Sequence, residues 1–162
     1  MQSNEIDKLK IQYKIAKGIG LFFLSSIFLY GFAAYWFLNR PQEPTFVSDA
    51  AGMQKYLYFL LSAISCCMIP VLKPVIINGR GLPKEYREVK PDYPQAASRL
   101  LTATIISYAL AEVPAFFGLV LALLTHQMKD FYILAAVSFG LILVNLPKWE
   151  EWENGIKKMI LV

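Results

Sequence analysis

The amino-acid sequence predicts an all-α, polytopic integral membrane protein with four transmembrane helices. Hydrophobic residues make up 56% of the 162 residues, and charged residues make up only 17%. The hydrophobic residues gather into four blocks, and nearly all of the charge lies between these blocks. This distribution is typical of a polytopic membrane protein rather than of a soluble domain. None of the blocks alternates between apolar and polar residues, which argues against barrel strands.

The four blocks predict four spans in a single membrane domain over residues 1–162. A helix needs roughly 20 apolar residues to cross the ~30 Å hydrocarbon layer. The first and third blocks reach that length directly, and the second and fourth reach it if Lys73 and Lys148 extend towards the headgroups. The first block is too long for a cleaved signal peptide and ends in bulky aromatic residues, so it is interpreted as a span. The expected spans are residues 18–38, 56–77, 100–125 and 131–149, with a cytoplasmic loop over residues 78–99.

The basic residues predict the orientation of these spans. Thirteen of the sixteen Lys and Arg residues fall in the N-terminal segment, the loop 78–99 or the C-terminal segment, or next to one of them. The other side holds only Arg40, Lys55 and Lys129. Because cytoplasmic loops carry an excess of Lys and Arg, both termini are expected in the cytoplasm, and the expected location is a bacterial inner membrane. The net charge of +4 is attributed to anionic lipid headgroups and not to nucleic acid.

The sequence indicates no soluble catalytic centre, no cofactor and no metal site. It contains no glycine-rich phosphate loop and no Ser/His/Asp set. Cys66 and Cys67 are adjacent, which suits packing in a span better than metal binding or a redox motif. His126 is alone in a short loop, next to no other ligand type. At most, the chain is expected to be a membrane subunit of a larger complex.

Glu112 is the candidate functional residue. It is the thirteenth residue of a 26-residue span, close to the middle of the bilayer, where a charged side chain costs at least ~3 kcal/mol. Burial disfavours the charged form of the carboxyl, which is what a proton carrier needs. The alternative is a structural role, in which a neutral acid is hydrogen-bonded to a neighbouring helix and holds that helix in place. In either case Glu112 is expected to face another helix, since an unpartnered buried polar group costs about 1–3 kcal/mol.

Four nearby residues are expected to influence Glu112. Tyr108 lies one helical turn before it, and Ser62 and Ser65 in the second span are the other candidate partners for its carboxyl. Pro114 is expected to kink the helix, because proline lacks an N–H group and clashes with the carbonyl four residues back.

The segment from Tyr93 to Leu124 resembles the second helix of subunit c, the proteolipid of rotary ATP synthases. In this chain Pro94 matches the loop proline of that family, Glu112 follows at the family's spacing, and the run from Phe117 to Leu123 continues as the family's does. The resemblance implies a subunit-c-like hairpin in the middle of the chain and a rotor-type subunit. It also implies a homo-oligomer in which Glu112 carries a proton supplied through a partner. Sodium-binding members have hydroxyl residues just after the acid, where this chain has Val113 and Pro114.

Two departures from the family, the missing glycines and the long basic loop, favour the alternative of a non-transporting scaffold subunit descended from a proteolipid. The second span contains no glycine, whereas the family's first helix carries a glycine repeat. The loop 78–99 is long, and the chain has four expected spans where subunit c has two. The loop is expected to be ordered by its prolines and to be the surface for a protein partner, through Lys84, Arg87, Lys90 and Pro94.

Overall fold

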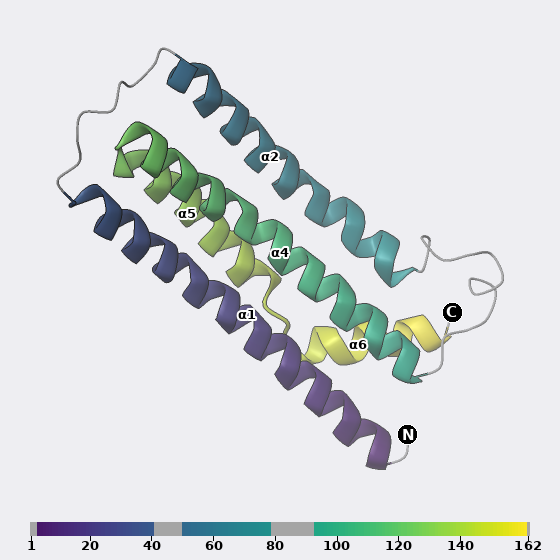
Figure 1. Cartoon of the computed structure of the whole chain (residues 1–162). Helices are drawn as coiled ribbons and strands as arrows, with labels where there is room; N and C mark the ends of the chain where they lie inside the picture. Colours follow the sequence, from purple (N-terminus) through teal and green to yellow (C-terminus); the bar gives the residue numbers. More distant parts are fainter. Residues whose placement is uncertain (1–2, 41–49, 79–92, 162) are drawn as a thin grey trace.

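The computed structural model describes residues 3–40, 50–78 and 93–161, and the described residues contain no strand. Four of the helices are long and apolar enough to cross a membrane, which confirms the expected all-α membrane fold. Figure 1 shows the five helices, which are α1 (Ser3–Leu38), α2 (Ala50–Ile77), α4 (Tyr93–Thr125), α5 (Met128–Asn145) and α6 (Trp149–Leu161).

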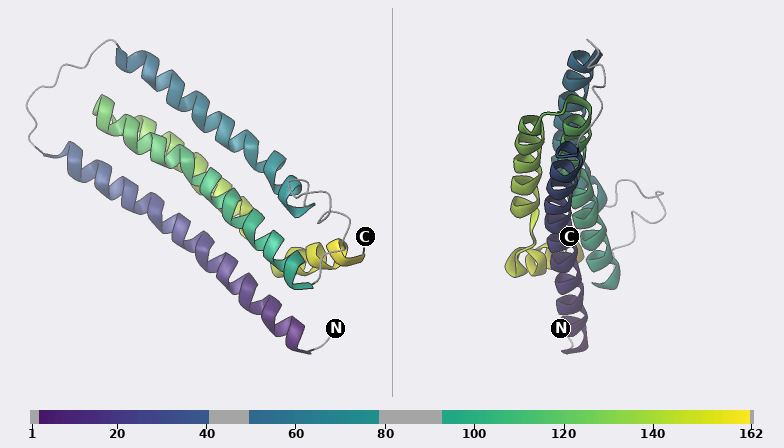
Figure 2. Two further views of the ribbon diagram at one scale, coloured as in Figure 1. Left: turned by 45° about the vertical axis from the view of Figure 1, so that its right-hand side comes forward. Right: turned by 60° about the vertical axis from the view of Figure 1, so that its left-hand side comes forward.

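Helix α4 is the centre of the bundle. It packs against α1, α2, α5 and α6, and it is the most buried of the four candidate spans. Helices α1 and α2 flank α4 on opposite sides, while α5 lies behind it (Figures 1 and 2). Helix α2 is the least buried span, and its main packing partner is α4. Any residue of α4 can therefore be placed by the neighbour that its side of the helix faces.

Small residues let α4 and α5 approach each other closely. The side of α4 that faces α5 carries Ala111, Ala115, Gly118 and Ala122. A Cβ atom added at Gly118 would lie 3.2 Å from the backbone Cα of Phe131, so the backbones leave little room for a larger side chain. Membrane helices pack in this way because no hydrophobic effect drives them together within lipid.

The end of the bundle where α1 begins has a hydrophobic core of its own. Helix α6 turns away from α5 and lies across this end of the molecule (Figure 2). It buries Trp152 and Ile156 against Leu9 and Ala16 of α1 and against the first turns of α4. Tyr13 of α1 makes edge contacts with the rings of both Trp149 and Trp152. The first turns of α1 are therefore packed against other helices of the chain.

Helices α1, α2, α4 and α5 all begin before the expected spans, α5 also ends earlier than expected, and one helix was not foreseen. The fourth span is Met128–Asn145, so it ends before residue 149, because Pro147 interrupts the helix two residues further on. After the break the chain forms α6, which begins where the span was expected to end. Helix α4 begins at Tyr93 rather than at residue 100, which places Pro94 in its first turn, where proline is well tolerated.

Polar contacts tie α2 to α5 near both ends of the two helices. Towards the end of the bundle where α5 begins, Lys55 Nζ lies 2.8 Å from Oδ1 of Asp130, whose side chain is 4% exposed. Towards the other end, Lys73 Nζ donates a hydrogen bond to Oδ1 of Asn145 at 3.3 Å. Lys73 was expected to extend towards the headgroups, and the structure instead turns it inwards to α5.

Candidate functional site

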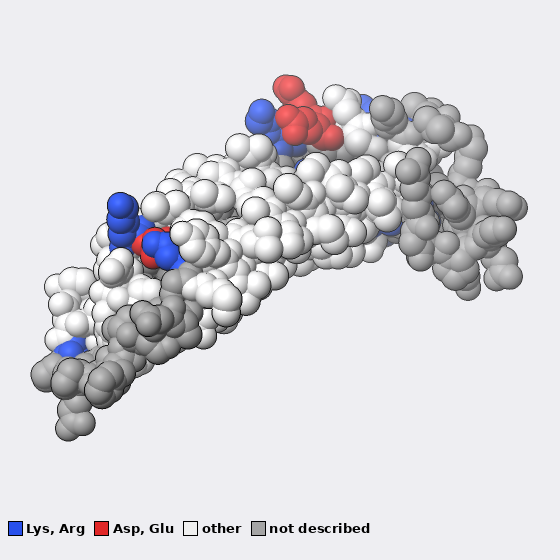
Figure 3. Space-filling view, turned by 90° about the horizontal axis from the view of Figure 1, so that it is seen from above, with Lys and Arg blue, Asp and Glu red and all other residues white. Residues whose placement is uncertain are grey.

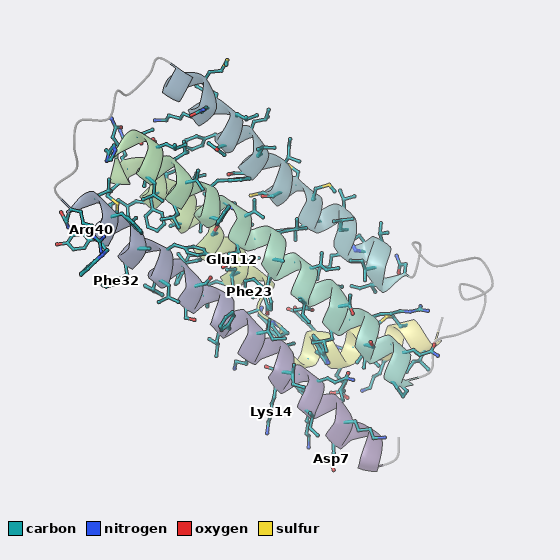
Figure 4. The ribbon with its side chains drawn as sticks, in the orientation of Figure 1. Asp7, Lys14, Phe23, Phe32, Arg40 and Glu112 are labelled. Carbon is teal, nitrogen blue, oxygen red and sulfur yellow. The ribbon has the colours of Figure 1, made fainter. Side chains whose placement is uncertain are left out.

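Glu112 lies half-buried on α4 and points at α1. Its Oε1 atom is hydrogen-bonded to Oγ of Ser26, and it accepts a second hydrogen bond of 2.8 Å from Oη of Tyr30. Ser26 and Tyr30 are one turn apart on α1, so both hydroxyls reach the same carboxyl oxygen. Figure 4 labels Glu112 near the middle of the bundle, with Asp7 and Arg40 near opposite ends of α1. The expectation that Glu112 faces a neighbouring helix is therefore confirmed.

The hydroxyl of Ser26 has two acceptors for its single hydrogen. It lies 2.7 Å from the carbonyl oxygen of Phe23 and is also hydrogen-bonded to Glu112. A serine hydroxyl donates one hydrogen and accepts through two lone pairs. If Ser26 donates to Phe23, the bond to Glu112 needs a proton on the carboxyl. If Glu112 is ionised, Ser26 can rotate its hydrogen from the carbonyl to the carboxylate.

The same two side chains can thus hydrogen-bond both protonation states of Glu112. In the neutral state the acid donates to Ser26 and accepts from Tyr30. In the ionised state the carboxylate accepts from both hydroxyls. No ion pair among the described residues involves Glu112. Figure 3 shows the charged side chains in separate groups, with a broad uncharged surface between them.

The open side of the site lies between α1 and α2. Along α4, Ala109 and Phe116 flank Glu112 by one turn on either side, and both are exposed. The ring of Tyr30 contacts that of Phe116 edge-on, with a centroid distance of 6.4 Å. Glu112 therefore sits at the edge of a strip of α4 that neither flanking helix covers.

Tyr108 fills the space next to the carboxyl along α4, one turn before Glu112. Its side chain is fully buried and is seated against Gly20 of α1, where an added Cβ would lie 2.8 Å from the phenol oxygen. The ring of Phe23 lies beside it at a centroid distance of 6.0 Å. The ring of Tyr108 thus fills the space between α1 and α4 on the side of the carboxyl that faces the start of α1.

Pro114 lies inside α4 next to the site, and α5 supplies a polar group at this position. The backbone N–H of Ala115 donates a 2.8 Å hydrogen bond to Oγ of Ser138, which is fully buried on α5. Pro114 itself has no N–H and crowds the carbonyl of Leu110. The segment of α4 that carries Glu112 is therefore held from two sides, by α1 through the carboxyl and by α5 through the backbone.

The support expected from three residues is provided by α1 instead. Ser62 Oγ donates to the carbonyl of Tyr58, and Ser65 Oγ donates to the carbonyl of Ser62, so both hydroxyls stay within α2. The hydroxyl of Tyr108 is buried and has no partner among the described residues. Helix α2 faces another side of α4, which is why its serines do not reach Glu112.

The remaining predicted residues lie away from the site. Lys84, Arg87 and Lys90 lie outside the described residues, as does most of the loop 78–99. Pro94 is exposed in the first turn of α4, Cys66 is half-buried and Cys67 is exposed on α2. His126 is exposed in the turn between α4 and α5, with a positive φ of 54°. Within the described part of the chain, no cluster of His, Cys, Asp and Glu could hold a metal ion.

Ser26, Tyr30 and Ser138 were not expected in the site. The first two had a detectable signal, since a pair of hydroxyls four residues apart falls on one face of an apolar span. Ser138 is a single hydroxyl in the fourth span, with no pattern that relates it to Pro114. Comparison of the chain with family models, with curated proteins and with solved structures found no match.

Proposed function

We propose that this membrane protein binds and releases a proton at Glu112 as part of a proteolipid-like proton-translocating assembly. The observation that carries the proposal is the pair of α1 hydroxyls on one carboxyl oxygen. An acid that serves as a carrier must be stable enough in both protonation states to exchange its proton. Ser26 supports both states, because its hydrogen can point to the carbonyl of Phe23 or to the carboxylate.

The position of the carboxyl supports exchange from the side of the bundle. Glu112 borders the exposed strip of α4 at Ala109 and Phe116, whereas Tyr108 fills the space next to the carboxyl one turn earlier on α4. A neighbouring copy or a separate membrane subunit placed on that strip would supply the proton route and the basic group that promotes release. Such side-by-side assembly is what the resemblance to subunit c implies.

The second candidate function is a scaffold in which the same cluster holds α1 to α4. One observation favours it, since both hydroxyl partners of Glu112 come from its own chain and tie together two spans that are far apart in the sequence. In that case the carboxyl stays protonated and its hydrogen bonds only stabilise the bundle.

Proton flux in reconstituted vesicles separates the two functions. Glu112→Gln keeps the size of the side chain, and its amide oxygen can accept from both Ser26 and Tyr30, but an amide does not titrate. We expect this variant to assemble normally and to lose proton flux. Ser62→Ala is the control, because that hydroxyl bonds only within α2. Flux equal to wild type in Glu112→Gln would end the carrier proposal and leave the scaffold.

Chemical modification gives an independent measure of the carboxyl. A membrane-soluble carbodiimide reacts with a protonated acid, so we expect modification of Glu112 that high pH prevents. A carboxyl that stays unmodified at every pH would contradict the carrier proposal and leave the scaffold.

A further inference from the structure

We propose that Ser138 is a positioning residue for Glu112. By accepting the N–H of Ala115, Ser138 holds the backbone of α4 next to Pro114 and thereby the placement of the carboxyl against the two hydroxyls of α1. The inference rests on the proposed function for its consequence in proton exchange, and on the geometry alone for the placement itself.

The first step is the weakness of α4 at this position. Pro114 removes one N–H from the helix ladder and its ring crowds the carbonyl of Leu110. Breaks of this kind persist in membrane spans when a neighbouring helix or a hydroxyl side chain satisfies the backbone. The stretch from Leu110 to Ala115 is therefore the part of α4 whose direction depends most on outside contacts, and Glu112 lies within it.

The second step is that Ser138 makes an unusual hydrogen bond for a hydroxyl in this protein. Its Oγ is fully buried and accepts from the backbone of another helix, at 2.8 Å from the N atom of Ala115. Among the described residues, the other Ser and Thr hydroxyls that bond to backbone donate to a carbonyl of their own helix. Ser138 is thus a contact between helices, located one residue after the proline.

The third step connects this contact to the carboxyl. Ala115 follows Glu112 by three residues, and its side of α4 faces α5, while Glu112 faces α1. A change in the backbone of α4 next to Pro114 would rotate or shift Glu112 relative to Ser26 and Tyr30. The carboxyl needs both hydroxyls within hydrogen-bonding distance, which is a tolerance of a few tenths of an ångström. Loss of the Ser138 contact is therefore expected to loosen the carboxyl without touching it.

The test compares Ser138→Ala with Ser62→Ala in the full-length protein. Both variants remove one buried serine hydroxyl, but the hydroxyl of Ser62 bonds only within α2. The measurements are hydrogen exchange of the segment containing Ala115 and the rate of carbodiimide modification of Glu112 as a function of pH. We expect both to change roughly threefold or more in Ser138→Ala, the effect of losing one hydrogen bond, and neither to change in Ser62→Ala.

Repeating Ser138→Ala in a Pro114→Ala variant distinguishes a positioning role of Ser138 from a general loss of packing. In Pro114→Ala the backbone ladder of α4 can be completed, so Ser138→Ala is expected to have a smaller effect on Glu112 there than in the wild type. Equal effects in the two backgrounds, or unchanged modification of Glu112 in Ser138→Ala, would overturn the inference. If Glu112→Gln conducts protons as the wild type does, the proposed function fails, yet exchange and modification still decide whether Ser138 positions the carboxyl.

Discussion

Tyr108 is the largest fully buried side chain among the described residues, and its hydroxyl has no hydrogen-bond partner within them. A buried hydroxyl without a partner costs about 1–3 kcal/mol. The ring is nonetheless well packed, since Gly20 leaves room for it and Phe23 lies beside it. At the scale of single residues, packing therefore fixes the position of the Tyr108 side chain. One turn further along α4, hydrogen bonds fix the position of Glu112.

Replacing Tyr108 with Phe is expected to stabilise the protein. The change keeps the ring in place and removes the unpartnered hydroxyl, so we expect a gain of about 1 kcal/mol and a rise in Tm of about 2–4 °C. Tyr30→Phe is the matched control, because it removes a hydroxyl that is hydrogen-bonded to Glu112 and should lower Tm. Thermal unfolding in detergent measures both. A lower Tm in Tyr108→Phe would indicate that the hydroxyl is hydrogen-bonded after all.

Two glycines of α1 are expected to respond in opposite ways to alanine. At Gly20 an added Cβ would lie 2.7 Å from Leu146 and 2.8 Å from the ring of Tyr108, so Gly20→Ala should cost about 1–3 kcal/mol. At Gly18 an added Cβ meets nothing within 4 Å, and alanine should gain up to about 1 kcal/mol through helix propensity. The two Tm values, measured side by side, should move apart. A neutral Gly20→Ala would contradict the close fit of Tyr108.

At the scale of helices, α2 depends mainly on one neighbour. It packs mainly against α4 and is tied to α5 by Lys55 and Lys73. Asp130 is buried in the first turn of α5, where the helix dipole favours an acid, and its second oxygen has no partner among the described residues. The ion pair with Lys55 is therefore what compensates this carboxylate, and it links helices that share few other contacts.

Lys55→Met is expected to be destabilising. It leaves Asp130 buried without its counter-charge, and the cost should fall below the about 3–5 kcal/mol of a fully buried pair because the side chain of Lys55 is 39% exposed. The double variant Lys55→Met with Asp130→Leu should recover most of the loss, because it removes the uncompensated charge as well. Lys129→Met, an exposed lysine next to the pair in sequence, is the control and should change little. Additive losses in the double variant, measured by unfolding, would show that the two residues are not coupled.

At the scale of the whole molecule, the two ends of the bundle are formed by different segments of the chain. The start of α1 and all of α6 lie at one end, and the α4–α5 turn lies at the other (Figure 1). Exposed lysines in the first turns of α1 and on α6 belong to the first end, and Arg40 and Lys129 to the second. The arrangement is consistent with four crossings, and the positive-inside rule predicts that the end with both termini is cytoplasmic.

Labelling of introduced cysteines tests this orientation. In a background with Cys66 and Cys67 replaced by Ala, we expect a membrane-impermeant thiol reagent to label His126→Cys in intact cells. Asp7→Cys should react only after the membrane is permeabilised. Both positions are exposed at opposite ends of the bundle, so each serves as the control for the other. Labelling of Asp7→Cys alone in intact cells would reverse the predicted orientation.

The sequence by itself determined the number of spans, their approximate limits and the isolation of Glu112 in the third of them. These properties follow from summed hydropathy along consecutive residues, which needs no knowledge of neighbours in space. The break at Pro147 was also visible in the sequence, although α6 was not foreseen. Only the tertiary structure decided that Ser26 and Tyr30 hold the carboxyl, that Ser62 and Ser65 do not, and that Ser138 contacts the backbone beside Pro114. Apolar helices have several sides on which they can pack at similar free energy, so a side chain's partner depends on which helix lies beside it.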